Sequence, residues 1–395
     1  MKRLPVILCA ALGWAGMATA AEQCGVCHPE SRVAYETSIH AREGFECTSC
    51  HGGDPASRSP EAAHRGNFRA LGDRLRIPAA CAECHADMER MRPYNLPVDQ
   101  YAVYLTSQHG QAIARGERRA AVCTDCHGSH GILGPADPAS PVNHRHLVDT
   151  CGRCHGDQGL MRAFDLDPGV VDEYRAGVHG RALLEGGRGA APDCTSCHGV
   201  HGAAPPGYGD IDKVCGACHA DTRSAFIAGR HHDAMRAAGL PECIACHDHH
   251  EVRGFGLEAI ETACEECHDE GSEQVLLGRQ IFTVLTSAGE ELDAAEQLAG
   301  KAQRSAVHVQ DHLSRIEEAR TYLTEALPLV HSVELEPVEG LARRARSIGE
   351  EVRHELYEKL DRRPARIGLA VFWFYLLMTL AVLIVYKRRL AAKPE

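Results

Sequence analysis

The chain has 395 residues, of which 44% are hydrophobic and only 5% aromatic, and its formal net charge is -12 at pH 7. This acidic balance excludes nucleic acid as an expected partner, because carboxylates repel phosphates, and it suits basic or cationic partners. So few aromatic residues leave little material for a conventional apolar core.

The first 20 residues have the pattern of a secretory signal peptide. Lys2 and Arg3 precede an apolar stretch over residues 4–17, and the small residues 18–20 offer a cleavage site before Ala21. We therefore expect residues 1–20 to be removed and the remainder to be exported. Cys9 lies inside the apolar stretch, and we interpret it as part of the discarded peptide.

Cysteine usage is the most informative feature of the rest of the chain. Eighteen of the 19 cysteines fall in nine copies of the pattern Cys-x-x-Cys-His. The cysteine pairs are Cys24 and Cys27, Cys47 and Cys50, Cys81 and Cys84, Cys123 and Cys126, Cys151 and Cys154, Cys194 and Cys197, Cys215 and Cys218, Cys243 and Cys246, and Cys264 and Cys267. The histidines that follow them are His28, His51, His85, His127, His155, His198, His219, His247 and His268.

This spacing is typical of covalent haem attachment. Two thiols add to the vinyl groups of a haem, and the adjacent histidine reaches the iron as its proximal ligand. Zinc ribbons and a disulfide scaffold are the alternatives. Zinc knuckles do not require a histidine after every second cysteine, and disulfides require none. The sequence therefore predicts nine covalently bound haem c groups.

The predicted haem domain is residues 21–270, and all nine motifs fall within residues 24–268, which leaves about 27 residues for each haem. So little polypeptide cannot surround each haem with its own core, so the haems would supply most of the apolar interior. We predict a mostly α-helical fold with extensive irregular loops, organised by the haems.

An internal repeat divides this domain. In two segments the first motif is followed 24 residues later by a histidine, His109 or His179, and then by a second motif. Shorter versions flank these segments. We therefore predict four two-haem modules, and the motif at Cys264 begins an unfinished fifth.

Sixteen of the 25 histidines lie outside the motifs, and eight of these are predicted to be distal ligands of the haem irons, because they recur at module positions. They are His40, His64, His109, His130, His179, His201, His232 and His250. His64 fits the repeat least well, and His144 and His146 are alternatives. For the ninth haem the next histidines along the chain are His308 and His312, and we favour His312 because it borders an apolar stripe.

Doubled Cys-x-x-Cys-His units with an upstream Ser-x-His-Gly or Gly-x-His-Gly and a downstream His-Gly-x-His resemble the multihaem c-type cytochrome superfamily. That group includes the tetrahaem cytochromes of sulfate reducers, the quinol-dehydrogenase tetrahaem proteins and the hydroxylamine oxidoreductase family. The resemblance covers residues 24–268. It implies bis-histidine haems that are packed closely enough to exchange electrons along a chain.

Residues 271–363 contain no cysteine and have the pattern of an amphipathic helical hairpin or stalk. Apolar residues recur at threes and fours from Leu292 to Ile316, which predicts one helix of about 40 residues. Pro328 and Pro337 are expected to break it before a second helix over residues 341–360. The resemblance implies that such helices cap the haem array.

Residues 364–388 are predicted to form a transmembrane anchor. The stretch 367–386 has 20 residues and no charge, and at about 1.5 Å per residue it spans roughly 30 Å, the thickness of a hydrocarbon core. Basic residues on both sides orient this span only weakly. Together with the signal peptide it predicts a single-pass protein of the inner (cytoplasmic) membrane. The haem domain would lie on the periplasmic or extracytoplasmic side, and residues 389–395 would form a cytoplasmic tail.

Two functions from different classes are open. The first is electron transport in anaerobic respiration, between a membrane quinol dehydrogenase or cytochrome b-type subunit and other redox proteins outside the cytoplasm. The second is a multihaem oxidoreductase of the hydroxylamine oxidoreductase type, in which one open-site haem acts on nitrogen or sulfur oxyanions. The sequence favours the first, because bis-histidine iron has no free position and no Cys-x-x-Cys-Lys motif occurs. We predict no catalytic residue.

Overall fold

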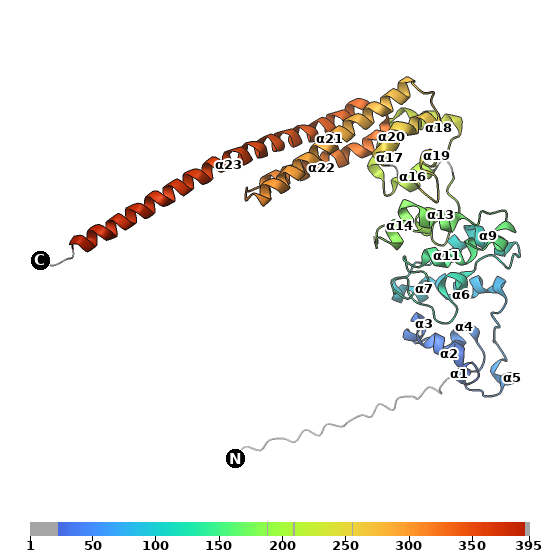
Figure 1. The fold of residues 1–395 in the computed structure, drawn as a ribbon. Helices are drawn as coiled ribbons and strands as arrows, with labels where there is room; N and C mark the ends of the chain where they lie inside the picture. The colour runs from blue at the N-terminus through green and yellow to red at the C-terminus, as the bar shows by residue number, and fades with distance from the viewer. Residues whose placement is uncertain (1–22, 188, 208–209, 255, 392–395) are drawn as a thin grey trace, which may run out of the picture. The chain divides into compact units, whose positions relative to one another are not determined.

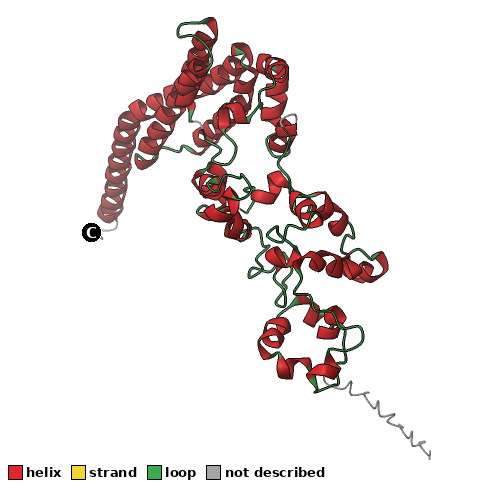
Figure 2. Cartoon of the chain, turned by 90° about the vertical axis from the view of Figure 1, so that its right-hand side faces the viewer, coloured by secondary structure: helices red, strands yellow, loops and turns green. Residues whose placement is uncertain are grey.

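The computed structural model describes residues 23–187, 189–207, 210–254 and 256–391. The predicted signal peptide, residues 1–20, and the last four residues of the predicted tail lie outside them. Within these ranges the chain consists of helices and loops and contains no strand (Figure 2). The predicted fold class, mostly α-helical with extensive irregular loops, is confirmed.

The chain divides into two compact units, residues 1–206 and 207–395. The first unit contains six Cys-x-x-Cys-His motifs, and the other three motifs belong to the same unit as the C-terminal helices (Figure 1).

Short helices joined by loops build the first unit. They are α1 (Cys24–Cys27), α2 (Pro29–Glu36), α3 (Ile39–Arg42), α4 (Cys47–His51), α5 (Pro60–Ala63), η1 (Arg74–Arg76), α6 (Ile77–His85), α7 (Met88–Met91), η2 (Arg92–Tyr94), α8 (Gln100–Thr106), α9 (Gln108–Ala114), α10 (Cys123–His127), α11 (Leu147–His155), α12 (Gln158–Arg162), α13 (Val170–Ala176), α14 (Val178–Leu184) and α15 (Cys194–His198). Three motif helices end at a glycine with positive φ, Gly52, Gly128 or Gly199, a conformation that glycine adopts without the strain a side chain would cause.

The second unit begins with helices of the same short kind. They are α16 (Ile211–Gly216), α17 (Ala220–Ala228), α18 (Arg230–Ala238), α19 (Ile244–His247), α20 (Leu257–Ala263) and η4 (Cys264–Glu266). Three long helices follow, namely α21 (Glu273–Arg304), α22 (Gln310–Leu329) and α23 (Leu335–Ala391), and the turn η5 (Val330–Ser332) joins the last two.

The long helices differ from the predicted hairpin. The single helix of about 40 residues is wrong, because the chain turns at residues 305–309 and Ala306 has a φ of 56°. Pro328 lies in the last turn of α22, where it does not interrupt the helix. Pro337 lies in the first turn of α23, where a backbone N–H would have no hydrogen-bond partner within the helix, so proline is tolerated. The result is a three-helix bundle.

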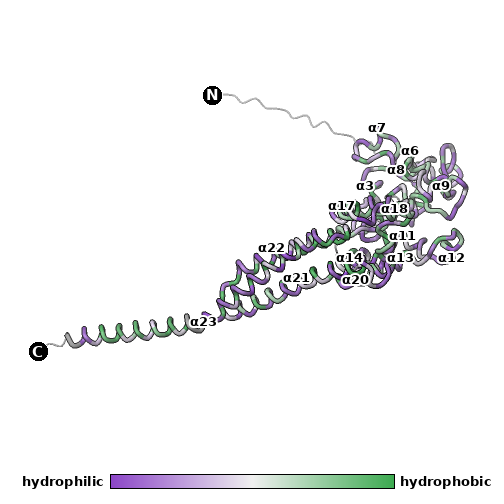
Figure 3. The backbone as a smooth tube through the Cα atoms, turned by 90° about the horizontal axis from the view of Figure 1, so that it is seen from above, coloured by the Kyte–Doolittle hydropathy of each residue, from purple (hydrophilic) through white to green (hydrophobic). Residues whose placement is uncertain are grey.

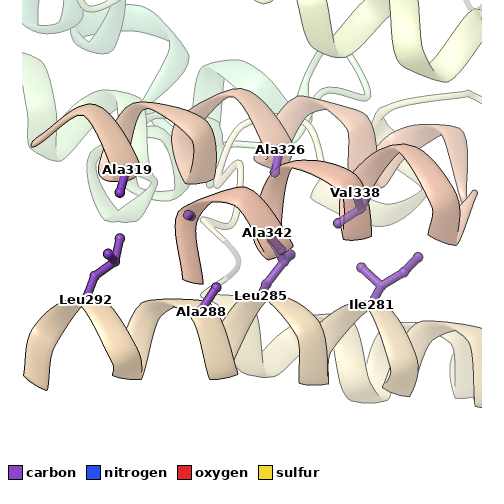
Figure 4. Close-up of a cluster of buried hydrophobic side chains, with 9 residues drawn as sticks. Ile281, Leu285, Ala288, Leu292, Ala319, Ala326, Val338 and Ala342 are labelled. Carbon is purple, nitrogen blue, oxygen red and sulfur yellow. The ribbon is translucent and has the colours of Figure 1, made fainter. Parts of the chain in front are cut away.

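The bundle has an apolar core to which all three helices contribute (Figure 4). Ile281, Leu285 and Leu292 of α21 lie among small residues of α22 and α23, such as Ala319 and Ala342. The small residues allow close approach of the helix backbones. A second cluster continues along the bundle to Val352 and Leu356 of α23.

We expect Leu292→Ala to destabilise the bundle by about 2 to 5 kcal/mol, because the fully buried side chain leaves a cavity. Leu276→Ala on the same helix is the control, since Leu276 is 49% exposed. Thermal unfolding followed by far-ultraviolet circular dichroism measures both changes. Equal shifts in the two variants would show that this core does not hold the bundle together.

The C-terminal half of α23 is apolar and exposed, unlike the part inside the bundle (Figure 3). An 18-residue window within residues 335–389 has a mean hydropathy of 2.5, and none of it is buried. Burial of this surface in water-free surroundings would remove a large unfavourable hydration cost. It is the one candidate membrane-spanning helix among the described residues, and it indicates single-pass anchoring.

Candidate haem sites

Three motif helices present their two cysteines and their histidine together. In α4, α10 and α15 the helix begins at the first cysteine and ends at the histidine. Positions i, i+3 and i+4 lie on one helix face, so both thiols and the imidazole point to the same side. This face is the local requirement for holding a haem by two thioethers and one axial ligand.

The third residue of the motif caps the same three helices. The hydroxyl of Ser49 accepts a hydrogen bond from the N–H of Glu46 at 3.0 Å. The carboxylate of Asp125 accepts from Val122 at 2.7 Å, and the hydroxyl of Ser196 accepts from Asp193 at 3.1 Å. Variable residues inside the motif therefore position the cysteines that they separate.

Backbone carbonyls orient the histidine of the second motif in three modules. The Nδ1–H groups of His51, His198 and His247 donate to carbonyl oxygens at 3.2, 3.1 and 3.3 Å, which belong to Arg69, Ala204 and Arg253. This bond places the proton on Nδ1, so Nε2 is the nitrogen with the lone pair that a metal would need.

Several motif histidines in the described part of the chain lie opposite a second histidine ring. In the first unit the pairs and their centroid distances are His28 and His64 (6.2 Å), His51 and His130 (6.3 Å), His85 and His40 (6.0 Å), His127 and His201 (6.2 Å), and His155 and His109 (6.0 Å). In the second unit they are His268 and His231 (6.2 Å), and His247 and His331 (6.0 Å).

These distances fit a metal between the two imidazoles. A metal–imidazole bond is about 2 Å long and the ring centroid lies about 1.2 Å behind the nitrogen, so a metal between two rings separates the centroids by roughly 6 Å. The spacing is uniform although the partners come from different loops and helices. The residues present therefore fit haem iron with two axial histidines.

Burial favours the neutral form of these rings, which is the form that binds a metal. Loss of solvent is the main cause that lowers the pKa of His40, His85, His109, His127, His130, His155, His201, His231 and His331.

The two motifs of one module lie against each other. The thiols of Cys81 and Cys123 are within hydrogen-bonding reach, and the same holds for Cys151 with Cys194 and for Cys215 with Cys243. Each pair joins the first cysteines of the two motifs in a predicted module. The two-haem repeat of the sequence is therefore also a repeat of the structure.

Histidine pairs also connect neighbouring modules. His40 of the first module faces His85 of the second, and His130 of the second faces His51 of the first. A backbone hydrogen bond also joins these two modules, because the N–H of Ile39 donates to the carbonyl of Ile132 at 2.8 Å. The second and third modules repeat it, where Gln108 donates to Ala203 at 3.2 Å.

In three modules a tyrosine lies three residues before the N-cap of the helix that carries a predicted distal histidine. The hydroxyls of Tyr35, Tyr104 and Tyr174 donate to the carbonyls of Phe45, Ala121 and Pro192 at 2.5, 2.9 and 2.6 Å. Each carbonyl lies two residues before the first cysteine of the next motif. The tyrosine thus connects the distal helix to the attachment helix of the same module.

Tyr104→Phe is expected to lower the free energy of unfolding by about 1 kcal/mol, because the Ala121 carbonyl loses its donor. Burial raises the pKa of Tyr104 to about 12, so the hydroxyl stays protonated at neutral pH. Thermal unfolding measures the change, and Tyr357→Phe at an exposed position is the control. An unchanged unfolding temperature in Tyr104→Phe would show that this hydrogen bond does not stabilise the module.

The structure places His64 opposite His28, as the prediction of a distal role requires. His144 and His146, which the sequence offered as substitutes anywhere in the scheme, make other contacts. His144 contacts the Asp193 carboxylate at 2.6 Å, and His146 contacts the Ser140 carbonyl at 3.0 Å.

Two predicted ligands of the second unit need correction. His231, and not the adjacent His232, faces His268. The ring of His232 instead packs on Phe226, and its Nδ1 lies 2.9 Å from Asp233. His312 was expected at the ninth haem, but its Nε2 lies 2.9 Å from the Lys359 amine inside the bundle.

Sequence reasoning missed His331 altogether, because this residue lies in the bundle and outside the repeat. The ring faces His247 from the connector η5. A usable signal was the missing second half of the fifth module. Because it is missing, the second motif of the fourth module lacks the downstream histidine that the repeat supplies elsewhere. His179 and His250 remain predictions from the repeat.

Comparison with known families gives a match within the first unit. Residues 39–156 match the family model of cytochrome c3. The chain therefore contains a cytochrome c3-type domain. The cytochrome c3 match begins at the helix that carries His40 and ends just after the motif histidine His155, so it includes the second module whole and parts of the first and third. It supports a multihaem cytochrome c that transfers electrons through covalently bound haem. No curated protein and no solved structure matches the chain.

Proposed function

We propose that the chain holds nine haem c groups and carries electrons along them between a quinol-oxidising membrane partner and redox proteins outside the cytoplasm. The observation that carries this proposal is the uniform spacing of the histidine pairs, from 6.0 to 6.3 Å. Two axial imidazoles leave an iron no open position.

The residues have separate tasks in this scheme. The motif cysteines would hold each haem, and the motif histidines would be the proximal ligands. The distal ligands supported by geometry are His64, His130, His40, His201, His109 and His231. Iron held in this way supplies one-electron chemistry without proton transfer or substrate binding.

Packing of the modules suits electron passage. Tunnelling rates fall exponentially with distance, and the cysteines that attach the two haems of a module lie within hydrogen-bonding reach. The exchange of histidines between modules supplies short routes from one module to the next. The protein needs no moving part for this task, which agrees with a structure that fixes most of these rings by a backbone bond or by burial.

The C-terminal helix and the charge point to the partners. An anchor at residues 364–388 would keep the haem domain at the membrane surface, where a quinol dehydrogenase or cytochrome b-type subunit delivers electrons. The net charge of -12 suits basic redox partners outside the membrane. The haem domain would face the periplasmic or extracytoplasmic side.

Intact mass tests the haem count. Protein expressed in an exporting host with haem maturation should carry nine haems. The double variant with Cys264→Ala and Cys267→Ala should carry one fewer, because it lacks one attachment site. A wild-type mass with fewer than nine haems would overturn the proposal.

A further inference from the structure

The connector between α22 and α23 brings a histidine to a haem motif from which it is distant in sequence. His331 lies in η5, and its ring stacks over His247 with centroids 6.0 Å apart and an interplanar angle of 24°. Both residues belong to the second unit. The spacing is the same as in the pairs that follow the module repeat.

Local hydrogen bonding prepares His331 for a metal. Its Nδ1–H donates to the Pro328 carbonyl at 3.2 Å, which leaves the Nε2 lone pair available. The motif histidine His247 makes the equivalent bond to Arg253 at 3.3 Å. The two rings therefore present the same nitrogen to the space between them.

The connector is held in place by close backbone contact. Val333 has a φ of 54° and turns the chain into α23 directly after η5. A Cβ added at Gly229 would lie 2.7 Å from the Ser332 carbonyl oxygen, so only glycine fits there. Gly229 is the N-cap of α18, which carries His231. One contact thus fixes the connector beside the helix that serves the ninth haem.

The module repeat shows what His331 replaces. In the second and third modules a downstream histidine, His130 or His201, faces the second motif of the preceding module. The fifth module ends after its first motif, so the fourth module receives no such histidine. His331 lies where that ligand is needed.

We propose that His331 is the distal ligand of the haem at Cys243–His247, and that this bond fastens the three-helix bundle to the last complete module. The proposal rests on the haem attachment proposed above for that motif. It gives the bundle a direct role in setting the ligation of one haem, in addition to its link to the membrane.

Magnetic circular dichroism of the oxidised His331→Ala variant tests this ligation. One of nine haems should become high-spin, and added imidazole should restore the low-spin spectrum. His354→Ala is the matched control on the bundle, because His354 is 78% exposed, and it should leave all haems low-spin. A His331→Ala protein that keeps nine haems by mass and remains entirely low-spin would overturn the proposal.

A second variant keeps the test decisive if alanine prevents maturation. His331→Met should retain an axial ligand, show the thioether-to-iron charge-transfer band and raise the potential of one haem. A spectrum identical to that of the wild type would contradict ligation by His331. Failure of the proposed function is distinguishable, because a haem missing from the motif at Cys243 would already appear in the wild-type mass.

Discussion

Replacing His231 with alanine is expected to convert one of nine haems to high spin, whereas replacing the adjacent His232 leaves every haem low-spin. The ring of His231 faces His268 at 6.2 Å, while His232 packs on Phe226. The effect is large because loss of an axial nitrogen changes the spin state of that iron completely. Magnetic circular dichroism of the oxidised variants reports the number of high-spin haems.

His312→Ala is a second control for the ninth haem. His312 is only 5% exposed, but its neighbours are Lys359 and Glu355, at 2.9 and 3.3 Å. We expect this variant to keep all haems low-spin. A high-spin haem in His312→Ala, together with an unchanged His231→Ala, would reverse the assignment of the ninth haem.

Truncation before Pro364 is expected to move the protein from the membrane to the soluble fraction with its haems retained. The removed segment includes the exposed apolar part of α23. A transmembrane helix binds a bilayer almost irreversibly, so the change in fraction should be nearly complete. The bundle keeps its core, because both apolar clusters lie before residue 364. Haem absorbance in the pellet and supernatant of lysed cells gives the result.

Truncation after Arg389 is the matched control, because it keeps the apolar stretch and removes only the end of the chain. This variant should stay in the membrane pellet after a high-salt wash. If the protein truncated before Pro364 also stays in the pellet, another segment holds it to the membrane.

The attachment residues could be predicted from the sequence because the chemistry is local. Two cysteines and a histidine at i, i+3 and i+4 share one helix face whatever the rest of the chain does. The proposed distal ligands are different, because most of them reach their partners from another module. The positions of His40, His109 and His231 follow from a shared backbone feature, an extended N-cap two residues earlier, at Ser38, Ser107 or Gly229.

That N-cap explains the error at His232. The histidine two residues after the N-cap Gly229 is His231. Spacing from the haem motifs alone does not distinguish His231 from the adjacent His232. His331 could not be found from the repeat, since its position depends on how α22 ends and how η5 packs beside Gly229. The turn at Ala306 was hidden for a similar reason, because apolar periodicity continues through residues 305–309 although the helix stops.

Binding of small ligands to the wild-type protein tests the electron-carrier account most directly. The oxidised protein is titrated with cyanide, nitrite and hydroxylamine while magnetic circular dichroism counts the high-spin haems. The account predicts nine low-spin haems and no spectral change with any of the three ligands. A high-spin haem that binds nitrite, hydroxylamine or cyanide would contradict it and indicate an oxidoreductase with an open iron site.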